Sequence, residues 1–242
     1  MRTWLAAALL LAGCGAPAKP VDAACTAVIF EQARFTDCIA RPGLDQVRLV
    51  TDPQLRDLPA LVDRLGNAAA QVRFAMNGGM YDDAGRPIGL AVNDGKLIHP
   101  LNRKPGPGNF HLLPNGVFSA EPDGWHVRTS DAFAALPPGR ASMATQSGPM
   151  LVIAGQLHPK IAPDGTSLHV RNAVGIDAQR RAHFVISDEA VSFGKLARLL
   201  RDRLGCRDAL FLDGSVSSLW DPAAGRIDQL AQLGPLLVVE AR

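Results

Sequence analysis

The sequence lacks a hydrophobic run long enough to cross a membrane as a helix. The apolar stretch at the amino terminus covers residues 4–11, whereas a membrane-spanning helix needs roughly 20 apolar residues. This stretch follows the positive charge of Arg2 and leads into a cysteine, Cys14. A short charged segment followed by an apolar one is typical of an export signal. We therefore expect an exported protein.

The four residues Leu11-Ala12-Gly13-Cys14 resemble the cleavage pattern of bacterial lipoproteins. Small residues precede the cut, and the thiol of Cys14 would receive the diacylglycerol that anchors the protein. The sequence thus predicts a signal peptide over 1–13, a tether over 14–24 and one domain over 25–242. Gly15 favours retention at the outer membrane, facing the periplasm, because an aspartate in that place would indicate the inner membrane. The alternative is an ordinary cleaved signal peptide in which Cys14 is incidental.

The chain also lacks an excess of charge of one sign. It has 25 lysine and arginine residues against 23 aspartate and glutamate residues, which gives a formal net charge of +2. This balance indicates no nucleic acid partner, and an anionic ligand would have to meet local cations. The lipid anchor is the only membrane contact that we expect, and the expected assembly is a monomer.

Cysteine and histidine are few and do not occur at the spacing of a metal site. We therefore predict no cofactor and no obligatory metal, although Asp82-Asp83 could hold a divalent ion. Cys25 and Cys38 flank two strand-like runs in a compartment where thiols oxidise, so a hairpin would bring them together. We predict a disulfide between them, which leaves Cys206 as a buried thiol.

Short strand-like segments alternate with glycine and proline turns along the chain. They cover residues 26–30, 34–36, 46–50, 72–76, 88–92, 110–113, 117–119, 125–128, 183–187, 209–212 and 236–240. One helix is expected over about 57–67, and a second between Ser192 as N-cap and Gly205 as its stop. The apolar run 209–212 follows directly, which predicts a central strand covered on both faces. The fold class is α/β (mixed α+β), a single domain with a central mixed β-sheet flanked by helices.

Four glycine-bearing segments follow or open predicted strands. They are Asn77-Gly78-Gly79-Met80-Tyr81, Gln146-Ser147-Gly148-Pro149-Met150, Arg171-Asn172-Ala173-Val174-Gly175-Ile176-Asp177 and Leu212-Asp213-Gly214-Ser215-Val216-Ser217-Ser218. Glycine allows a ligand to approach the backbone, and the neighbouring side chains can donate hydrogen bonds or carry charge. Alternatively, these segments are ordinary turns without a ligand, and Arg171 is a solvated surface charge. A serine hydrolase using Ser147 or Ser217 is a minor alternative, because no Gly-x-Ser-x-Gly elbow surrounds Ser147.

In this order, the four segments resemble the phosphodiester glycosidase family. The resemblance extends from Cys25 to Val239 and is closest to a bacterial exported branch. The family includes the lysosomal enzyme that removes N-acetylglucosamine from the phosphate of a mannose phosphodiester. The lysosomal type has a segment that resembles Asp-Gly-Gly-Gly-Ser where this chain has Asp213-Gly214-Ser215-Val216-Ser217. The added side chains would reshape the pocket, so the resemblance does not imply the same sugar. Carried over by position, the resemblance implicates Asn77, Gly78, Gly79, Gly148, Pro149, Arg171, Asp177, Asp213, Gly214 and Ser217, and we add Gln146, Ser147 and Asn172 as substrate-binding residues.

The implied reaction is hydrolysis of the bond between sugar C1 and a phosphate oxygen in an envelope or extracellular glycan. The leaving phosphate monoester has a second pKa of about 6 and needs little protonation at neutral pH. The site then needs cations or N–H groups for the phosphate, and a carboxylate for the oxocarbenium-like centre or for water. We assign the first role to Arg171 with the backbones of Gly148 and Gly214, and the second role to Asp213.

Other residues are weaker candidates. Asp188 and Glu189 follow the strand 183–187 and could supply a second carboxylate, with a solvated turn as the alternative. Tyr81 could stack on a sugar ring, although core packing is the more common fate of aromatic residues. The alternative function is a non-catalytic glycan-binding lipoprotein that assists polysaccharide assembly or export.

Overall fold

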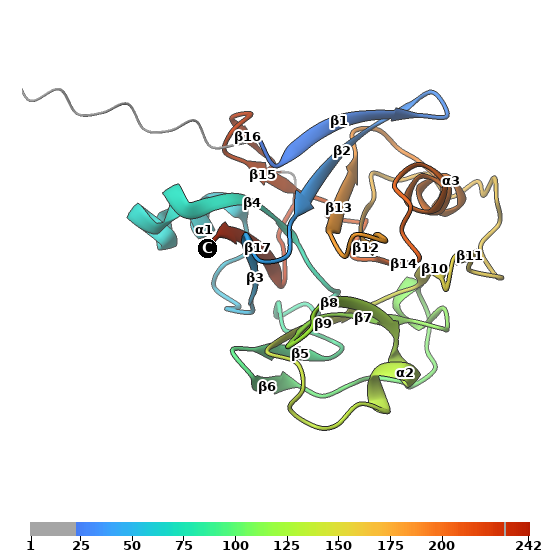
Figure 1. The fold of residues 1–242 in the computed structure, drawn as a ribbon, viewed down its shortest axis with the longest axis horizontal. Coiled ribbons are helices and arrows are strands. Elements are labelled where there is room, and N and C mark those ends of the chain that lie inside the picture. The colour runs from blue at the N-terminus through green and yellow to red at the C-terminus, as the bar shows by residue number, and fades with distance from the viewer. Residues whose placement is uncertain (1–22, 230) are drawn as a thin grey trace, which may run out of the picture.

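The computed structural model describes residues 23–229 and 231–242. The predicted signal peptide, the predicted lipidation site Cys14 and most of the predicted tether lie outside these residues. In the described part of the chain, the strands form three sheets and every strand pairing is antiparallel (Figure 1).

The first sheet has the strand order β1-β2-β13-β12-β14-β10-β11. Its strands are β1 (Cys25–Phe30), β2 (Ala33–Ala40), β10 (Met150–Ile153), β11 (Gln156–Leu157), β12 (Asn172–Ile176), β13 (Ala182–Ser187) and β14 (Asp208–Phe211). The second sheet, in the order β16-β15-β4-β17-β3, contains β3 (Asp45–Val50), β4 (Val72–Asn77), β15 (Leu219–Asp221), β16 (Arg226–Ile227) and β17 (Leu236–Ala241). The third sheet, in the order β6-β5-β9-β7-β8, contains β5 (Ala91–Asn93), β6 (Lys96–His99), β7 (Gly116–Glu121), β8 (Gly124–Thr129) and β9 (Met143–Ser147).

The helices are short and begin at side-chain caps. They are α1 (Leu58–Leu65), α2 (Ser130–Ala134) and α3 (Phe193–Arg198), with 3-10 turns η1 (Gly66–Gln71) and η2 (Asn109–His111) and a π-helical turn η3 (Leu199–Arg203) that continues α3. The Asp57 carboxylate accepts from the Ala60 N–H at 2.7 Å, and the Ser192 hydroxyl accepts from the Lys195 N–H at 3.1 Å. Within the described ranges, we find no helix with the length and apolar character of a membrane span.

One apolar core is shared by all three sheets. The ring of Phe184 in β13 meets Phe74 in β4 and Phe118 in β7 edge to face, with centroids 5.3 Å and 5.5 Å apart. Each sheet thus contributes one ring to the same cluster, and all three rings are fully buried. Such edge-to-face pairs add to the free energy gained by burying the rings. The sheets therefore fold as one domain.

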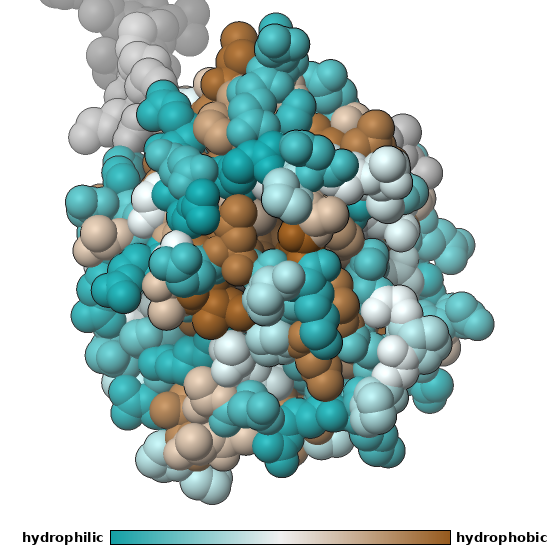
Figure 2. All heavy atoms as spheres, turned by 90° about the vertical axis from the view of Figure 1, so that its right-hand side faces the viewer, coloured by the Kyte–Doolittle hydropathy of each residue, from teal (hydrophilic) through white to brown (hydrophobic). Residues whose placement is uncertain are grey.

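The outer face of each sheet is covered by a helix. In β14, Leu210 joins the shared core, whereas Ala209 and Phe211 pack under α3. Helix α1 covers the second sheet through Leu58 and Leu61, and α2 lies against the third. Seen from the side of α3 and β11, the surface gathers apolar side chains toward its middle, with hydrophilic ones around them (Figure 2).

The fold class expected from the sequence, a mixed α and β single domain, is confirmed. Its strands form three antiparallel sheets instead of one central mixed sheet. Residues 110–113 are not a strand, because Phe110 is buried from the turn η2. Only the end of the run 88–92 is a strand, since the N–H of Leu90 bonds to the Gln146 side chain and not to a neighbouring strand.

The predicted disulfide is confirmed. Strands β1 and β2 form a hairpin in which Cys25 lies opposite Cys38, and their sulfur atoms are bonded at 2.06 Å. The third thiol, Cys206, is free and buried beside Gly175, and this burial raises its pKa. Ionisation to the reactive thiolate is thereby suppressed at neutral pH.

Replacing Cys25 and Cys38 together by alanine is expected to lower the free energy of unfolding by about 3 kcal/mol, because the bond closes a short loop with a sequence separation of 13. Urea unfolding with and without a reductant measures this loss. Reductant should destabilise the wild type and leave the double variant unchanged. Equal stability of both proteins without reductant would contradict the prediction.

Candidate active site

The ends of three strands are joined by a buried ring of hydrogen bonds. Asn172, the first residue of β12, donates from Nδ2 to the carbonyl and Oδ1 of Asn77, the last residue of β4, at 3.0 Å and 2.9 Å. Asn77 Nδ2 donates to the carbonyl of Asp213, which follows β14, at 3.0 Å. The Asp213 N–H returns to Asn172 Oδ1 at 3.0 Å. The first, third and fourth segments singled out from the sequence therefore meet at one place.

Serine hydroxyls tie the remaining segment into this ring. Ser147 Oγ, at the end of β9, donates to the Leu212 carbonyl at 2.5 Å. Ser217 Oγ lies 3.3 Å from the Asp213 carbonyl and 3.4 Å from Asn172 Oδ1. In the described chain, neither hydroxyl has a histidine among its hydrogen-bond partners. This geometry does not favour the serine hydrolase alternative.

The glycines of these segments allow protein groups to pack closely. A Cβ on Gly79 would lie 2.3 Å from the Gln146 carbonyl oxygen, and one on Gly214 would lie 2.7 Å from the Phe211 ring. A Cβ on Gly148 would lie 2.7 Å from the Phe110 carbonyl, and one on Gly78 would lie 3.2 Å from a backbone oxygen. A side chain is therefore excluded sterically at Gly79, Gly148 and Gly214, and at Gly78 it would make a tight contact.

The Gln146 side chain also serves the fold. Its Oε1 accepts from the N–H groups of Leu90 and Asn102, both at 2.9 Å, and its Nε2 donates to Ser130 Oγ at 2.9 Å. These bonds occupy both ends of the carboxamide. Gln146 thus positions the segment that precedes β5, and substrate binding by this residue stays a prediction.

Asp213 faces a cavity of about 460 Å³ beside the ring of hydrogen bonds. Its polar lining consists of Arg56, Tyr81, Asp82, Asp83, Asp213, Ser215 and Gln232. Burial raises the pKa of Asp213 from its ordinary value of 3.8 to about 6, and the Ser215 N–H, 3.3 Å from Oδ1, opposes this rise. Among the described residues, no cationic group lies within 4 Å of this carboxylate. Asp213 therefore changes protonation near neutral pH, as acid–base catalysis requires.

Tyr81 and Arg56 form another wall of the same cavity. The Arg56 guanidinium lies over the Tyr81 ring, 5.4 Å from its centroid, and the Tyr81 hydroxyl donates to the Gln232 carbonyl at 2.5 Å. Burial and the charge of Asp213 raise the pKa of Tyr81, so the phenol stays protonated. The sequence indicated Tyr81 only as an aromatic that could stack on a sugar. It gave no signal for Arg56, which precedes a helix N-cap outside every glycine-bearing segment.

Arg171 is buried away from the lining of this cavity. Its Nε donates to the Val191 carbonyl and its Nη2 to the Ser167 carbonyl, both at 2.9 Å. The guanidinium stacks on the Phe193 ring with its Cζ 3.7 Å from the centroid. Burial lowers the pKa of Arg171 to about 10. These contacts hold two loops together, and phosphate binding by Arg171 stays a prediction.

The other carboxylates named from the sequence have structural partners. Asp188 Oδ1 accepts from Arg226 Nη1 at 2.9 Å, and Glu189 Oε1 accepts from the Arg34 N–H at 2.8 Å. Asp177 is bonded to Arg181 and to the buried His183. None of the three lines the cavity at Asp213, whereas Asp82 and Asp83 do. The structure thus does not bring Asp188 or Glu189 to Asp213 as a second catalytic carboxylate.

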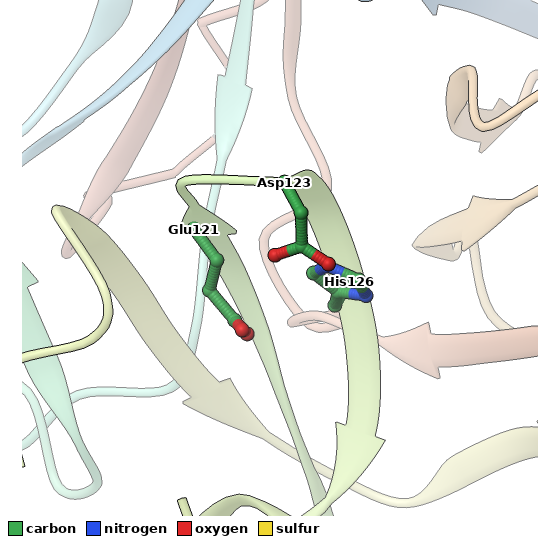
Figure 3. Close-up of side chains that lie close together, drawn as sticks. All are labelled: Glu121, Asp123 and His126. Atoms are coloured by element: carbon green, nitrogen blue, oxygen red, sulfur yellow. The ribbon is translucent and has the colours of Figure 1, made fainter. Parts of the chain in front are cut away.

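Within residues 23–229 and 231–242, one group could offer ligands to a metal. It consists of Glu121, Asp123 and His126 at the β7–β8 turn, with ligand atoms within 4.8 Å of one another (Figure 3). Glu121 is paired with both Arg128 and Arg140, and Arg140 also bonds Asp123 at 2.9 Å. These arginines already neutralise the carboxylates, so the arrangement is an ion-pair cluster at the turn.

Known proteins resemble this chain in sequence or in fold. The sequence model of the phosphodiester glycosidase family matches residues 70–237, a stretch that contains all four segments. The chain belongs to this family. A bacterial relative, the uncharacterized protein YigE of Escherichia coli K12, is 37% identical over 154 residues, which cover 64% of this chain and 60% of that protein. The match thus spans less than two thirds of this relative.

Two solved structures have a similar fold. One is the catalytic domain of zebrafish N-acetylglucosamine-1-phosphodiester alpha-N-acetylglucosaminidase, auto-inhibited by pro-peptide, with a TM-score of 0.61 and 16% identity over 90% of this chain and 82% of that chain. The other is a hypothetical protein from Synechocystis, with a TM-score of 0.58 and 14% identity over 90% of this chain and 61% of that chain. At such identities, the likeness concerns the fold alone.

Replacing Asp213 by asparagine is expected to stabilise the protein at neutral pH. The raised pKa means that ionised Asp213 destabilises the fold, a cost that is full above pH 6 and absent below about pH 4. The shift corresponds to roughly 3 kcal/mol at most, and we expect about 2 kcal/mol because the side chain is partly exposed. Urea unfolding at pH 7.5 and pH 4 tests this, and a gain of equal size at both values would refute it.

Replacing Asn172 by alanine should lower the free energy of unfolding by about 2–3 kcal/mol, because it leaves buried groups of Asn77 and Asp213 without partners. Thermal and urea unfolding measure this loss. Asn102→Ala is the matched control, since Asn102 is less buried and lies outside the ring. A loss for Asn172→Ala no larger than that of the control would argue against the buried ring as a source of stability.

Proposed function

We propose that this protein is a hydrolase that cleaves the glycosidic bond of a sugar-1-phosphodiester. Membership of the phosphodiester glycosidase family supports this class of reaction. The observation that carries the proposal is the carboxyl group of Asp213, which has a pKa of about 6 and faces a cavity large enough for a sugar ring. Three of the family's segments meet at its backbone, so the backbone that carries this carboxyl is held in place.

In the proposed reaction, the bond between C1 of the sugar and the phosphate oxygen breaks. The bonding electrons leave with the phosphate, and water supplies the new oxygen at C1. Because the departing phosphate monoester is already a stable anion near neutral pH, the reaction needs little help from a general acid. Asp213 in its carboxylate form stabilises the positive charge that develops at C1, or takes a proton from the attacking water.

The proposed setting is the cell envelope. The amino-terminal sequence supports an exported lipoprotein anchored through Cys14 and facing the periplasm. The substrate would then be a phosphodiester-linked sugar in an envelope or extracellular glycan. The sugar need not be that of the zebrafish enzyme, because the segment around Asp213 carries Ser215 and Val216, two side chains that line the cavity.

Purified protein should release sugar from at least one member of a panel of synthetic sugar-1-phosphodiesters, and Asp213→Asn should lower kcat by about 10³-fold. The rate should rise with pH through about pH 6, because the carboxylate is the active form. Asp131→Asn is the matched control, since its side chain is 84% exposed and pairs with Arg103. It should leave the rate unchanged.

Two results would contradict this proposal. One is full activity of Asp213→Asn on a substrate that the wild type hydrolyses. The other is saturable binding of the sugar phosphodiesters by the wild type without release of sugar from any of them. That second result would favour a glycan-binding lipoprotein that has kept the cavity but has no turnover.

A further inference from the structure

We propose that Arg56 receives the phosphate group of the substrate and thereby selects glycosides whose leaving group is an anion. The inference rests on the proposed function and names the specificity-determining residue of the same site. Arg56 lies outside the four glycine-bearing segments and outside the stretch that the family model matches. It is placed at the cavity by the fold.

The stem of Arg56 is fixed by contacts with a distant part of the chain. Its Nε donates to the Leu233 carbonyl at 2.7 Å, and its own carbonyl accepts from the Leu233 N–H, also at 2.7 Å. Leu233 is buried, so this anchor has little freedom. The next residue, Asp57, caps helix α1, which fixes the backbone on the other side. The guanidinium is therefore pre-organised before any ligand arrives.

The Arg56 guanidinium packs closely against Gly85 and has no counter-ion among the described residues. Gly85, at a φ of +79°, lies so close that a Cβ there would be 2.8 Å from Arg56 Nη1. Among the described residues, no carboxylate oxygen lies within 4 Å of the Arg56 nitrogens. The nearby Asp82 is already held by Arg86, with its Oδ2 2.9 Å from Arg86 Nε. No carboxylate of the described chain thus neutralises Arg56, whose guanidinium otherwise contacts Tyr81.

Tyr81 interacts both with Arg56 and with the proposed catalytic carboxyl of Asp213. The Arg56 guanidinium lies over the Tyr81 ring, and the charge of Asp213 acts on the Tyr81 phenol. Arg56, Tyr81 and Asp213 all line the one cavity. A sugar with its C1 near Asp213 can therefore direct a phosphate toward Arg56. A guanidinium fork matches two phosphate oxygens at once.

Asp82, Asp83 and Asp213 place negative charge around the same cavity, and they would repel an anion in the absence of a cation. Arg56 is the one arginine or lysine among the residues that line it. The guanidinium of Arg171, the arginine indicated by the sequence, is held by Val191 and Ser167. Arg56 therefore has both the position and the unneutralised positive charge that phosphate recognition needs.

The test compares two substrates of the same sugar, a sugar-1-phosphodiester and a neutral aryl glycoside, with full-length protein. Arg56→Gln should lower kcat/KM for the phosphodiester by about 10²-fold, while kcat/KM for the aryl glycoside changes less than about threefold. Arg56→Lys should recover part of the loss, because it keeps the charge but not the fork. Arg64→Gln is the control, since Arg64 lies on α1 with its side chain 56% exposed and pairs with Asp52.

An equal loss on both substrates, or an equal loss in the Arg64→Gln control, would overturn the role of Arg56. Calorimetric binding of the sugar 1-phosphate separates this role from the proposed function. If the wild type hydrolyses neither substrate, the proposed function fails. Arg56 is still supported if Arg56→Gln weakens this binding at least tenfold, and it is refuted if the two proteins bind the sugar phosphate equally well.

Discussion

The candidate site depends on a buried ring of amide hydrogen bonds at the junction of the three sheets. Asn77 ends a strand of the second sheet, Asn172 begins a strand of the first, and Ser147 ends a strand of the third. Their side chains bond to one another or to the segment that carries Asp213. Buried polar groups are costly unless each has a partner, so this ring fixes the relative positions of the strand ends. The backbone of Asp213, which takes part in the ring, is thereby held in place.

The ring explains why a destabilising carboxyl can be kept at this position. The backbone of Asp213 is held by Asn77 and Asn172, while its carboxylate has only the Ser215 N–H as a weak partner. The free energy gained from the hydrogen bonds of the ring therefore offsets the cost of burying the Asp213 carboxyl, and this burial raises its pKa. Arg56 repeats this arrangement, because the Leu233 carbonyl holds its Nε while no carboxylate of the described chain neutralises its charge. The scaffold thus fixes the positions of Asp213 and Arg56, and it leaves each of them without an oppositely charged partner.

The sequence predicted those features of the fold that depend on residues close together in the chain. The cap Ser192, the hairpin disulfide and the doubly covered strand β14 follow from neighbouring residues, and each agrees with the structure. The three-sheet arrangement could not be predicted, because it depends on pairings such as β4 with β17 across most of the chain. The surroundings of Arg56 and Arg171 could not be predicted either. The residue that anchors Arg56 lies 177 residues away in the sequence, and the loop that binds the Arg171 side chain carries no motif.

A crystal structure of Asp213→Asn with a sugar-1-phosphodiester bound tests this site directly. We expect the anomeric carbon beside residue 213 and the phosphate on the guanidinium of Arg56, with the Asn77 and Asn172 side chains bonded as in the free protein. A sugar phosphate bound elsewhere, with the cavity at residue 213 empty at saturating ligand, would contradict it.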